Sequence, residues 1–199
     1  MARRLGVSRD DVIAAAVRVC DRGGLDGLTV AAVAGEVGCR PPSVYHHVDG
    51  LDGLQRAVAL EAARDLHGRL DDAVDDRRGR AALEAIASTV ASWSRERAGA
   101  WAALCRPVDG ELDPTLHDAR CDLLAPATRA LEDVGIDEEA RGRWTTTLVA
   151  ACRGAAAVQV DGEPGTASDR AAAHDLLVSL LLDRLVSEAP ATGRAGDPA

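Results

Sequence analysis

The chain has 199 residues and a formal net charge of −9, and 47% of its residues are hydrophobic. This length is enough for one large domain or two small ones, and the acidic balance argues against non-specific binding of nucleic acid by the whole molecule. The chain has no Phe, one Tyr and three Trp, so its core must be built from Ala, Leu and Val. Ala is the strongest helix former and strand patterns are nearly absent, so we expect an all-α protein.

Five cysteines are scattered through the chain without a C-x-x-C pair, at Cys20, Cys39, Cys105, Cys121 and Cys152. An odd number of scattered thiols is typical of a reducing compartment. The sequence also shows no apolar signal core near its start and no apolar run of transmembrane length. We therefore expect a cytoplasmic protein that does not interact with a membrane.

The first expected helix covers residues 8–22 and follows a short basic arm. Ser8 and Asp11 have the spacing of a capping box, and Cys20 lies on the apolar face, which favours a core thiol over a reactive one. Arg3 and Arg4 lie in the arm. Paired arginines at such a place can reach phosphates or a narrow minor groove of DNA, although arms of this kind are often simply frayed.

The stretch from Thr29 to Leu51 has the pattern of a helix, a tight turn and a second short helix. The apolar residues of the first of these helices recur at i, i+3, i+4 and i+7, as Val30, Val33, Ala34 and Val37. Thr29 precedes them as a cap, and Gly38 follows them where a left-handed residue is needed to stop a helix.

A second helix is expected to begin at two prolines. Pro41 and Pro42 lack N–H donors and fit only the first turn of a helix, which we expect to continue through Val48. A helix, a Gly-containing turn and a polar, aromatic helix form the helix-turn-helix signature. The alternative is an ordinary pair of packed helices in which Tyr45 is a half-buried core residue.

The run from Thr29 to Leu54, preceded by an Ala-rich amphipathic helix, resembles the DNA-binding domain of TetR-family transcriptional regulators. The residues that carry the resemblance are Thr29, Gly38, Pro42, Ser43, Tyr45, His47 and Leu54. The resemblance implies a three-helix helix-turn-helix head in residues 1–50. A connector helix would join it to a larger helical body for ligand binding and dimerisation in residues 51–189. Residues 190–199 are polar and rich in Gly and Pro, and we expect them to be a disordered tail.

Contacts with DNA are expected around the second helix of this motif. A recognition helix places its N-terminal residues against base edges, while flanking residues hold phosphates. Arg can bond guanine bidentately, so we expect Arg40 to read a base, and the alternative is a solvated turn residue. The resemblance implies contacts with the DNA backbone for Tyr45 and His47. The complete expected set is Arg3, Arg4, Thr29, Arg40, Pro41, Ser43, Tyr45, His46 and His47.

Two positions depart from the family pattern. Leu51 stands where many members have a Lys that binds phosphate at the start of the connector helix, and Ala31 stands where some members have a polar, base-reading residue. Backbone N–H groups at the start of the connector helix could replace the lost Lys contact. Both departures predict a smaller set of polar contacts and a modest affinity for DNA.

The remaining apolar patterns predict six further helices, separated by Gly, Pro and charged loops. Their approximate ranges are 51–72, 80–96, 100–105, 114–134, 137–158 and 168–189. Gly99 is expected to separate the second of these helices from the third, and Pro126 is expected to kink the fourth. The domain boundary is expected near the start of the first.

The segment from Trp93 to Leu104, WSRERAGAWAAL, resembles a subtype of these regulators in which an aromatic residue precedes an R-E-x-x-G-x-aromatic stretch. The resemblance implies a small-molecule cavity lined by the aromatics and the next helix. The candidate ligand-binding residues are Trp93, Trp101, His117, Cys121 and Trp144. The alternative is that all three Trp residues are core, since Trp is highly buried on average. A body built from small side chains could, however, leave a cavity between its helices.

The last two long helices have wide faces rich in Ala and Leu, and LLVSLLLDRLV is too apolar for a helix with one buried side. The resemblance implies that they pair with those of a second copy as a four-helix bundle. A two-fold homodimer would present two recognition helices to half-sites about one helical turn apart, so a palindromic operator in double-stranded DNA is expected. The resemblance also favours a repressor that a small-molecule effector releases from DNA.

Three other functions compete with this reading. No G-x-S-x-G, P-loop or dinucleotide motif is present, so we expect neither an enzyme nor a cofactor. A metal-sensing regulator is suggested by His117 and Cys121, four residues apart, with Cys105 as a further ligand, but no metal site is assigned on this spacing alone. A helical interaction module without DNA binding is favoured by the neutral head and Leu51, because phosphate neutralisation usually dominates affinity.

Overall fold

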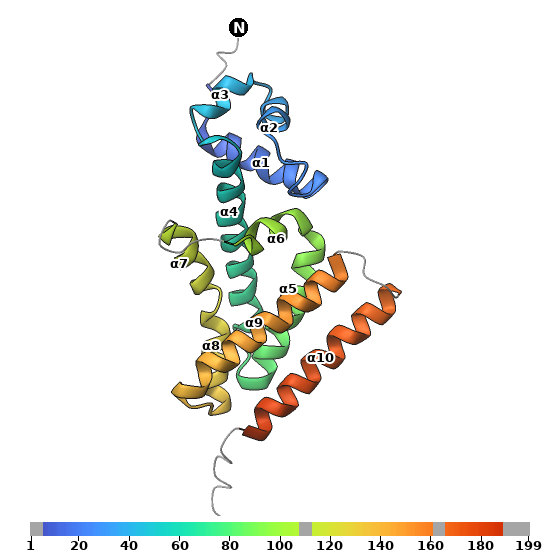
Figure 1. Ribbon diagram of the computed structural model, residues 1–199. Helices are drawn as coiled ribbons and strands as arrows, with labels where there is room; N and C mark the ends of the chain where they lie inside the picture. Colours follow the sequence, from blue (N-terminus) through green and yellow to red (C-terminus); the bar gives the residue numbers. More distant parts are fainter. Residues whose placement is uncertain (1–5, 108–112, 161–165, 189–199) are drawn as a thin grey trace, which may run out of the picture. The chain divides into compact units, whose positions relative to one another are not determined.

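The computed structural model of the chain describes residues 6–107, 113–160 and 166–188, and every regular element in these ranges is an α-helix (Figure 1). The all-α fold expected from the composition is confirmed. None of the described helices combines the length and the apolar character needed to cross a lipid bilayer. Arg3, Arg4 and the expected tail at 190–199 lie outside the described residues.

The chain divides into two compact units, and each combines segments that are distant in the sequence. The first unit comprises residues 1–65 and 96–120, and the second comprises residues 66–95 and 121–199. The division falls inside a long helix, whereas the sequence suggested a boundary near residue 50. The assignment of DNA binding to residues 1–50, and of ligand binding and dimerisation to residues 51–189, stays a prediction.

The first unit is built from α1 (Arg9–Gly23), α2 (Val30–Val37), α3 (Pro41–Tyr45), the N-terminal part of α4 (Gly50–Val74), α6 (Ala98–Cys105) and most of α7 (Pro114–Asp122). α1 packs against both α2 and α6, and α2 packs against α3. The buried side chains are mostly small, among them Val12, Ala15, Ala16, Leu28, Val33, Ala34, Val44, Leu54 and Val58. Small side chains let the helices of this unit lie close together.

Local signals fix the helix starts in this unit, as the sequence predicted. The Ser8 side chain accepts a hydrogen bond from the Asp11 N–H at 3.1 Å, and Asp11 Oδ2 accepts one from the Ser8 N–H at 2.9 Å, so the capping box is confirmed. The hydrogen bonds from the Ser8 hydroxyl and N–H lower the pKa of Asp11. Thr29 Oγ1 accepts a hydrogen bond from the Ala32 N–H at 3.1 Å and caps α2.

The second unit contains the C-terminal part of α4, α5 (Gly79–Glu96), α8 (Ala125–Val134), α9 (Glu138–Val160) and α10 (Ala167–Glu188). α9 packs against α8 and against α10, and α9 and α10 lie side by side and run in opposite directions (Figure 1). The core of this unit consists of Val74, Ala82, Leu83, Ala127, Ala130, Leu131, Ile136, Trp144, Leu182 and Leu185.

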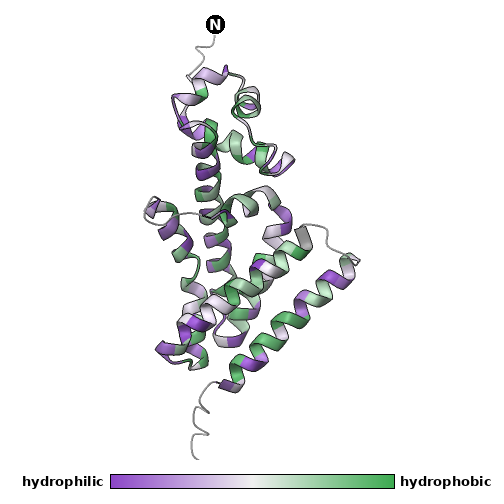
Figure 2. Ribbon diagram, viewed as in Figure 1, coloured by the Kyte–Doolittle hydropathy of each residue, from purple (hydrophilic) through white to green (hydrophobic). Residues whose placement is uncertain are grey.

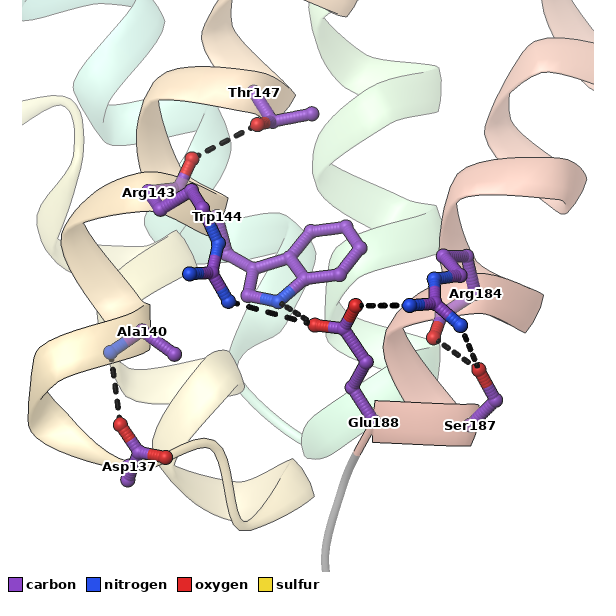
Figure 3. Close-up of polar contacts among 8 residues, drawn as sticks. All are labelled: Asp137, Ala140, Arg143, Trp144, Thr147, Arg184, Ser187 and Glu188. Carbon is purple, nitrogen blue, oxygen red and sulfur yellow. Dashed lines mark hydrogen bonds and ion pairs between the residues drawn. The ribbon is translucent and has the colours of Figure 1, made fainter.

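The end of α10 is attached to α9 through Glu188 (Figure 3). Glu188 Oε2 accepts a hydrogen bond from Trp144 Nε1 at 3.0 Å, and the carboxylate also pairs with Arg143 at 3.7 Å and with Arg184 at 2.6 Å. The Trp144 ring is buried in the core, so this bond provides the partner that a buried indole N–H needs. The contact joins the last turn of α10 to the hydrophobic core.

Between residues 96 and 134, two predicted helix boundaries are wrong. Residues 114–134 form two helices rather than one kinked helix, because Pro126 lies at the second position of α8, where its missing N–H removes no helical hydrogen bond. The break after α5 lies at Arg97, which has φ −126° and ψ 47°, rather than at Gly99, which lies inside α6.

Candidate nucleic-acid interface

The turn between α2 and α3 is set by a glycine with a left-handed backbone. Gly38 has φ 78° and ψ 33°, and its N–H donates to the carbonyl oxygens of Ala34 and Gly35. The Cys39 N–H also donates to the Ala34 carbonyl oxygen, at 2.9 Å. These bonds satisfy carbonyl groups at the end of α2, and the chain then starts α3 at Pro41, as predicted.

α3 combines a buried anchor with accessible side chains. Val44 is fully buried, and Val48, just after α3, is nearly so. Tyr45 is 59% exposed, so the alternative of a half-buried core tyrosine is wrong. Arg40 is exposed, and at the N-cap of α3 its side chain makes no capping hydrogen bond. The phenol and the guanidinium group are therefore both accessible to a partner.

α3 ends earlier than the sequence predicted. Its last residue is Tyr45, and the His47 and Val48 N–H groups both donate to the Val44 carbonyl oxygen, at 2.9 and 3.2 Å. These bonds close a turn that buries Val48 and leads into α4. Of the other predicted contact residues, Pro41 and His46 are exposed, whereas Ser43 and His47 are half-buried.

Thr29 and the two departures from the family pattern are also accessible. Thr29 is exposed, and although its Oγ1 accepts the capping bond, the hydroxyl hydrogen is still available to a phosphate. Leu51 is 42% exposed in the first turn of α4, and Ala31 is exposed on α2. Neither departure is explained by a role in the core.

Two arginines of α1 are already paired within the first unit. Arg18 Nε lies 2.8 Å from Glu36 Oε1, and Arg22 pairs with the other oxygen of the same carboxylate. Hydrogen bonds from Arg22 and Arg18 lower the pKa of Glu36. The three residues tie α1 to α2 and use positive charge that would otherwise be available to a phosphate.

Two contacts that the sequence did not reveal tie α6 to the rest of the first unit. Arg97 Nε lies 2.9 Å from Asp21 Oδ2 on α1, and Arg97 Nη1 lies 2.9 Å from Asp65 Oδ2 on α4. Gly99 brings α6 so close to α1 that a Cβ at this position would lie 2.1 Å from the Cys20 carbonyl oxygen. Cys20 itself is buried, as predicted, and burial raises the pKa of its thiol to about 11.

The five candidate ligand-binding residues divide between the two units. Trp101 and His117 belong to the first unit, whereas Trp93, Cys121 and Trp144 belong to the second. Trp93 and Trp144 are buried, Trp101 is half-buried, and His117 and Cys121 are exposed on α7. The burial of Trp93 and Trp144 agrees with the alternative in which the tryptophans are core residues. A ligand role for the five stays a prediction.

Two of the hollows in the second unit differ in chemistry, and neither of these two is lined by those five residues. One is a cavity of about 470 Å³ whose polar lining comes from α4, α8 and the turn before α5, with Asp71, Arg77, Arg78, Arg129, Glu132 and Asp133. The other is small and mainly apolar, lies between α5, α9 and α10, and includes Cys152 and His174. Burial raises the pKa of Cys152 to about 11 and lowers that of His174.

The described residues contain no cluster of side chains that could bind a metal ion. Within residues 6–107, 113–160 and 166–188, no three His, Cys, Asp or Glu side chains gather so that they could hold a metal ion. A zinc site usually needs at least three protein ligands. The metal-sensing alternative built on Cys105, His117 and Cys121 therefore has no support in the described residues.

Comparison with known proteins agrees with this architecture. No family model matches the chain. An uncharacterised HTH-type transcriptional regulator of Mycobacterium tuberculosis is 32% identical over 139 residues, which are 70% of this chain and 64% of that protein. The chain thus spans just under two thirds of the length of this relative.

Solved structures share the fold at low sequence identity. A regulatory protein of the TetR family from Rhodococcus RHA1 matches with a TM-score of 0.67 at 19% identity, over 89% of this chain and 96% of that one. A TetR variant from Acinetobacter baumannii, in complex with minocycline, matches with a TM-score of 0.62 at 18% identity, over 91% of this chain and 95% of that one.

In this chain α1, α2 and α3 are followed by a long helix and further helices. The proteins compared above are named as an HTH-type transcriptional regulator, a regulatory protein of the TetR family and a TetR variant. In sequence, the chain is similar to an HTH-type transcriptional regulator, and it shares its fold with TetR-family proteins of known structure. The helical fold expected from the resemblance at Thr29, Gly38, Pro42 and Tyr45 is thereby confirmed.

Proposed function

We propose that the chain is a DNA-binding transcriptional regulator that reads double-stranded DNA with α3 and the residues around it. The observation that carries the proposal is the accessibility of Arg40 and Tyr45 on a short element whose Val44 is fully buried. A buried anchor fixes the directions of the neighbouring side chains, as a site for precise recognition requires. Arg40 is the proposed base reader, because a guanidinium group can donate two hydrogen bonds to one guanine.

The other proposed contacts are mainly to the DNA backbone. Hydroxyl groups and imidazoles can donate to phosphate oxygens, and such contacts fix the position of the protein on the duplex. The proposed backbone contacts come from Thr29, Ser43, Tyr45, His46 and His47, with Pro41 packed against the sugar-phosphate chain. Arg3 and Arg4 are proposed to extend this surface.

We further propose a homodimer that binds a palindromic operator through two copies of α3. Leu176 and Leu180, four residues apart on α10, are 61% and 59% exposed, and Val158 on α9 and Val186 on α10 are exposed as well. Figure 2 shows hydrophobic residues recurring along α10. Contiguous exposed apolar surface marks interaction sites, and a two-fold dimer buries the same patch on both copies.

The proposed regulator is a cytoplasmic repressor that a small molecule releases from DNA. The support for an effector is the minocycline bound to one structural neighbour, together with the cavity of about 470 Å³ in the second unit. Release requires that the effector bind the form with low DNA affinity more tightly than the form with high affinity.

Fluorescence anisotropy with a duplex enriched from a random pool tests the role of α3. Arg40→Ala should weaken binding of this duplex by about 5- to 150-fold, because a bidentate base contact contributes about 1–3 kcal/mol. Tyr45→Ala should also weaken it. Arg64→Ala is the control, since Arg64 is exposed on α4 and paired with Glu61. Wild-type affinity in both Arg40→Ala and Tyr45→Ala would contradict the proposal.

A further inference from the structure

The described part of the helix-turn-helix region, residues 6–50, contains four arginines that differ in their partners. Arg18 and Arg22 are bound by Glu36, and Arg40 is the proposed base reader. Arg9 lies in the first turn of α1, is exposed, and makes no hydrogen bond or ion pair with the described residues. Arg9 is therefore a second arginine of this region whose charge is available to a partner.

The first turn of α1 lies beside the end of α3. Figure 1 shows the start of α1 next to α3. Asp11, two residues after Arg9, has its pKa lowered first by Ser8, and the charge of His47 contributes to the same lowering. A charge acts on a carboxylate in this way only at short range in salt solution. The first turn of α1, which includes Arg9, therefore lies near the residues that follow α3.

Neighbouring carboxylates do not neutralise Arg9. Asp11 Oδ2 is held by the Ser8 N–H and hydroxyl, at 2.9 and 2.7 Å. Asp10 follows Arg9 directly, and adjacent residues of a helix do not face each other. At the start of α4, moreover, the exposed Leu51 supplies no charge. Within residues 6–50, Arg9 and Arg40 are thus the two arginines without an ion pair to the described residues.

We propose that Arg9 is a phosphate-binding residue of the DNA interface and holds the backbone beside the segment that α3 reads. The inference rests on the proposed function and adds a residue to it. A phosphate contact strengthens binding to every sequence by a similar factor. Each neutralised phosphate also makes the slope of log affinity against log salt concentration more negative by about 0.9.

Binding titrations of the 199-residue chain over a series of salt concentrations test the proposal. They use wild type, Arg9→Gln and the matched control Arg18→Gln, with the enriched duplex and an unrelated duplex of equal length. Arg9→Gln should weaken both complexes by a similar factor, about 3- to 10-fold at low salt, and should reduce the salt slope by about one. Arg18→Gln should change neither quantity. Thermal unfolding of both variants checks that the fold is retained.

Three results would overturn the role of Arg9. The first is an unchanged salt slope in Arg9→Gln. The second is a loss of affinity confined to the enriched duplex, which would indicate a base contact. The third is an equal loss of affinity in Arg18→Gln, which would indicate a general effect of charge. If Tyr45→Ala loses binding while Arg9→Gln does not, the role of Arg9 fails and the proposed function stands. If wild type binds no duplex, the proposed function itself fails.

Discussion

Gly99 shows how one residue sets the packing of the first unit. A Cβ at this position would lie 2.1 Å from the carbonyl oxygen and 2.9 Å from the Sγ of Cys20. Real Cβ atoms do not approach a backbone oxygen so closely, so any larger residue must move α6 away from α1. Arg97, two residues earlier, would then lose its geometry with Asp21 and Asp65.

Gly99→Ala should therefore lower the free energy of unfolding by about 2 kcal/mol or more, towards the upper end of the cost of overpacking. Gly142→Ala is the matched control, because a Cβ at that position on α9 would meet nothing within 4 Å. This control should be neutral or raise the free energy of unfolding by up to about 1 kcal/mol. Denaturant titration measures both, and equal stability of Gly99→Ala and wild type would contradict the packing described.

The sequence revealed residues whose role is local and missed residues whose role depends on distant partners. The capping roles of Ser8 and Thr29 and the left-handed Gly38 were predictable, because each acts on backbone groups a few residues away. Gly99 was interpreted as a helix interruption, since its partner Cys20 lies far away in the sequence. Arg97 was missed for the same reason, as its two partners lie 76 and 32 residues away.

At the scale of elements, apolar periodicity predicted the long helices and failed at short ones. α4 and α5 begin and end within two residues of the expected ranges. α3 has only five residues, and its end depends on the burial of Val48 and the turn into α4 rather than on any stop signal within it. The break between α7 and α8 was expected as a kink, because a proline alone does not tell whether a helix bends or restarts.

The apolar face of α10 gives a prediction at this scale. The double change Leu176→Gln and Leu180→Gln should raise the dissociation constant of the proposed dimer by about 100-fold or more, because burial of each Leu contributes about 1.5–3 kcal/mol. Helical content should be retained, since both side chains are largely exposed within one chain.

Sedimentation equilibrium measures the dimer constant, and Ala171→Gln, at another exposed position of α10, is the control. A wild-type chain that stays monomeric at micromolar concentration would exclude the dimer. A double variant that dimerises as tightly as wild type would place the contact on another surface.

At the scale of the whole molecule, the sequence predicted the helix-turn-helix head but not the composition of the two units. Residues 96–120 join the first unit, and one reason is a pair of 2.7 Å hydrogen bonds from Arg56 to Asp113, 57 residues away. These bonds lower the pKa of Asp113.

The candidate ligand residues were chosen by residue type within a weak motif, and residue type alone does not determine which of them share a cavity.

The distribution of charge also acts at this scale. Residues 1–50 contain six arginines and six acidic residues, so the net charge of −9 belongs to the rest of the chain. An acidic molecule gains little from long-range attraction to DNA. In the proposed complex, affinity would then come from a few contacts around α3 and from binding two half-sites at once.

Selection of bound sequences from a random pool of duplex DNA tests the central claim, that α3 reads DNA, most directly. The selection uses the wild-type chain and the Arg40→Ala, Tyr45→Ala double variant. Wild type should enrich an inverted repeat whose half-sites have centres about 10 base pairs apart or a multiple of that spacing, and the double variant should not enrich it. A wild-type pool that stays as random as the input, or the same motif enriched by the double variant, would contradict the account.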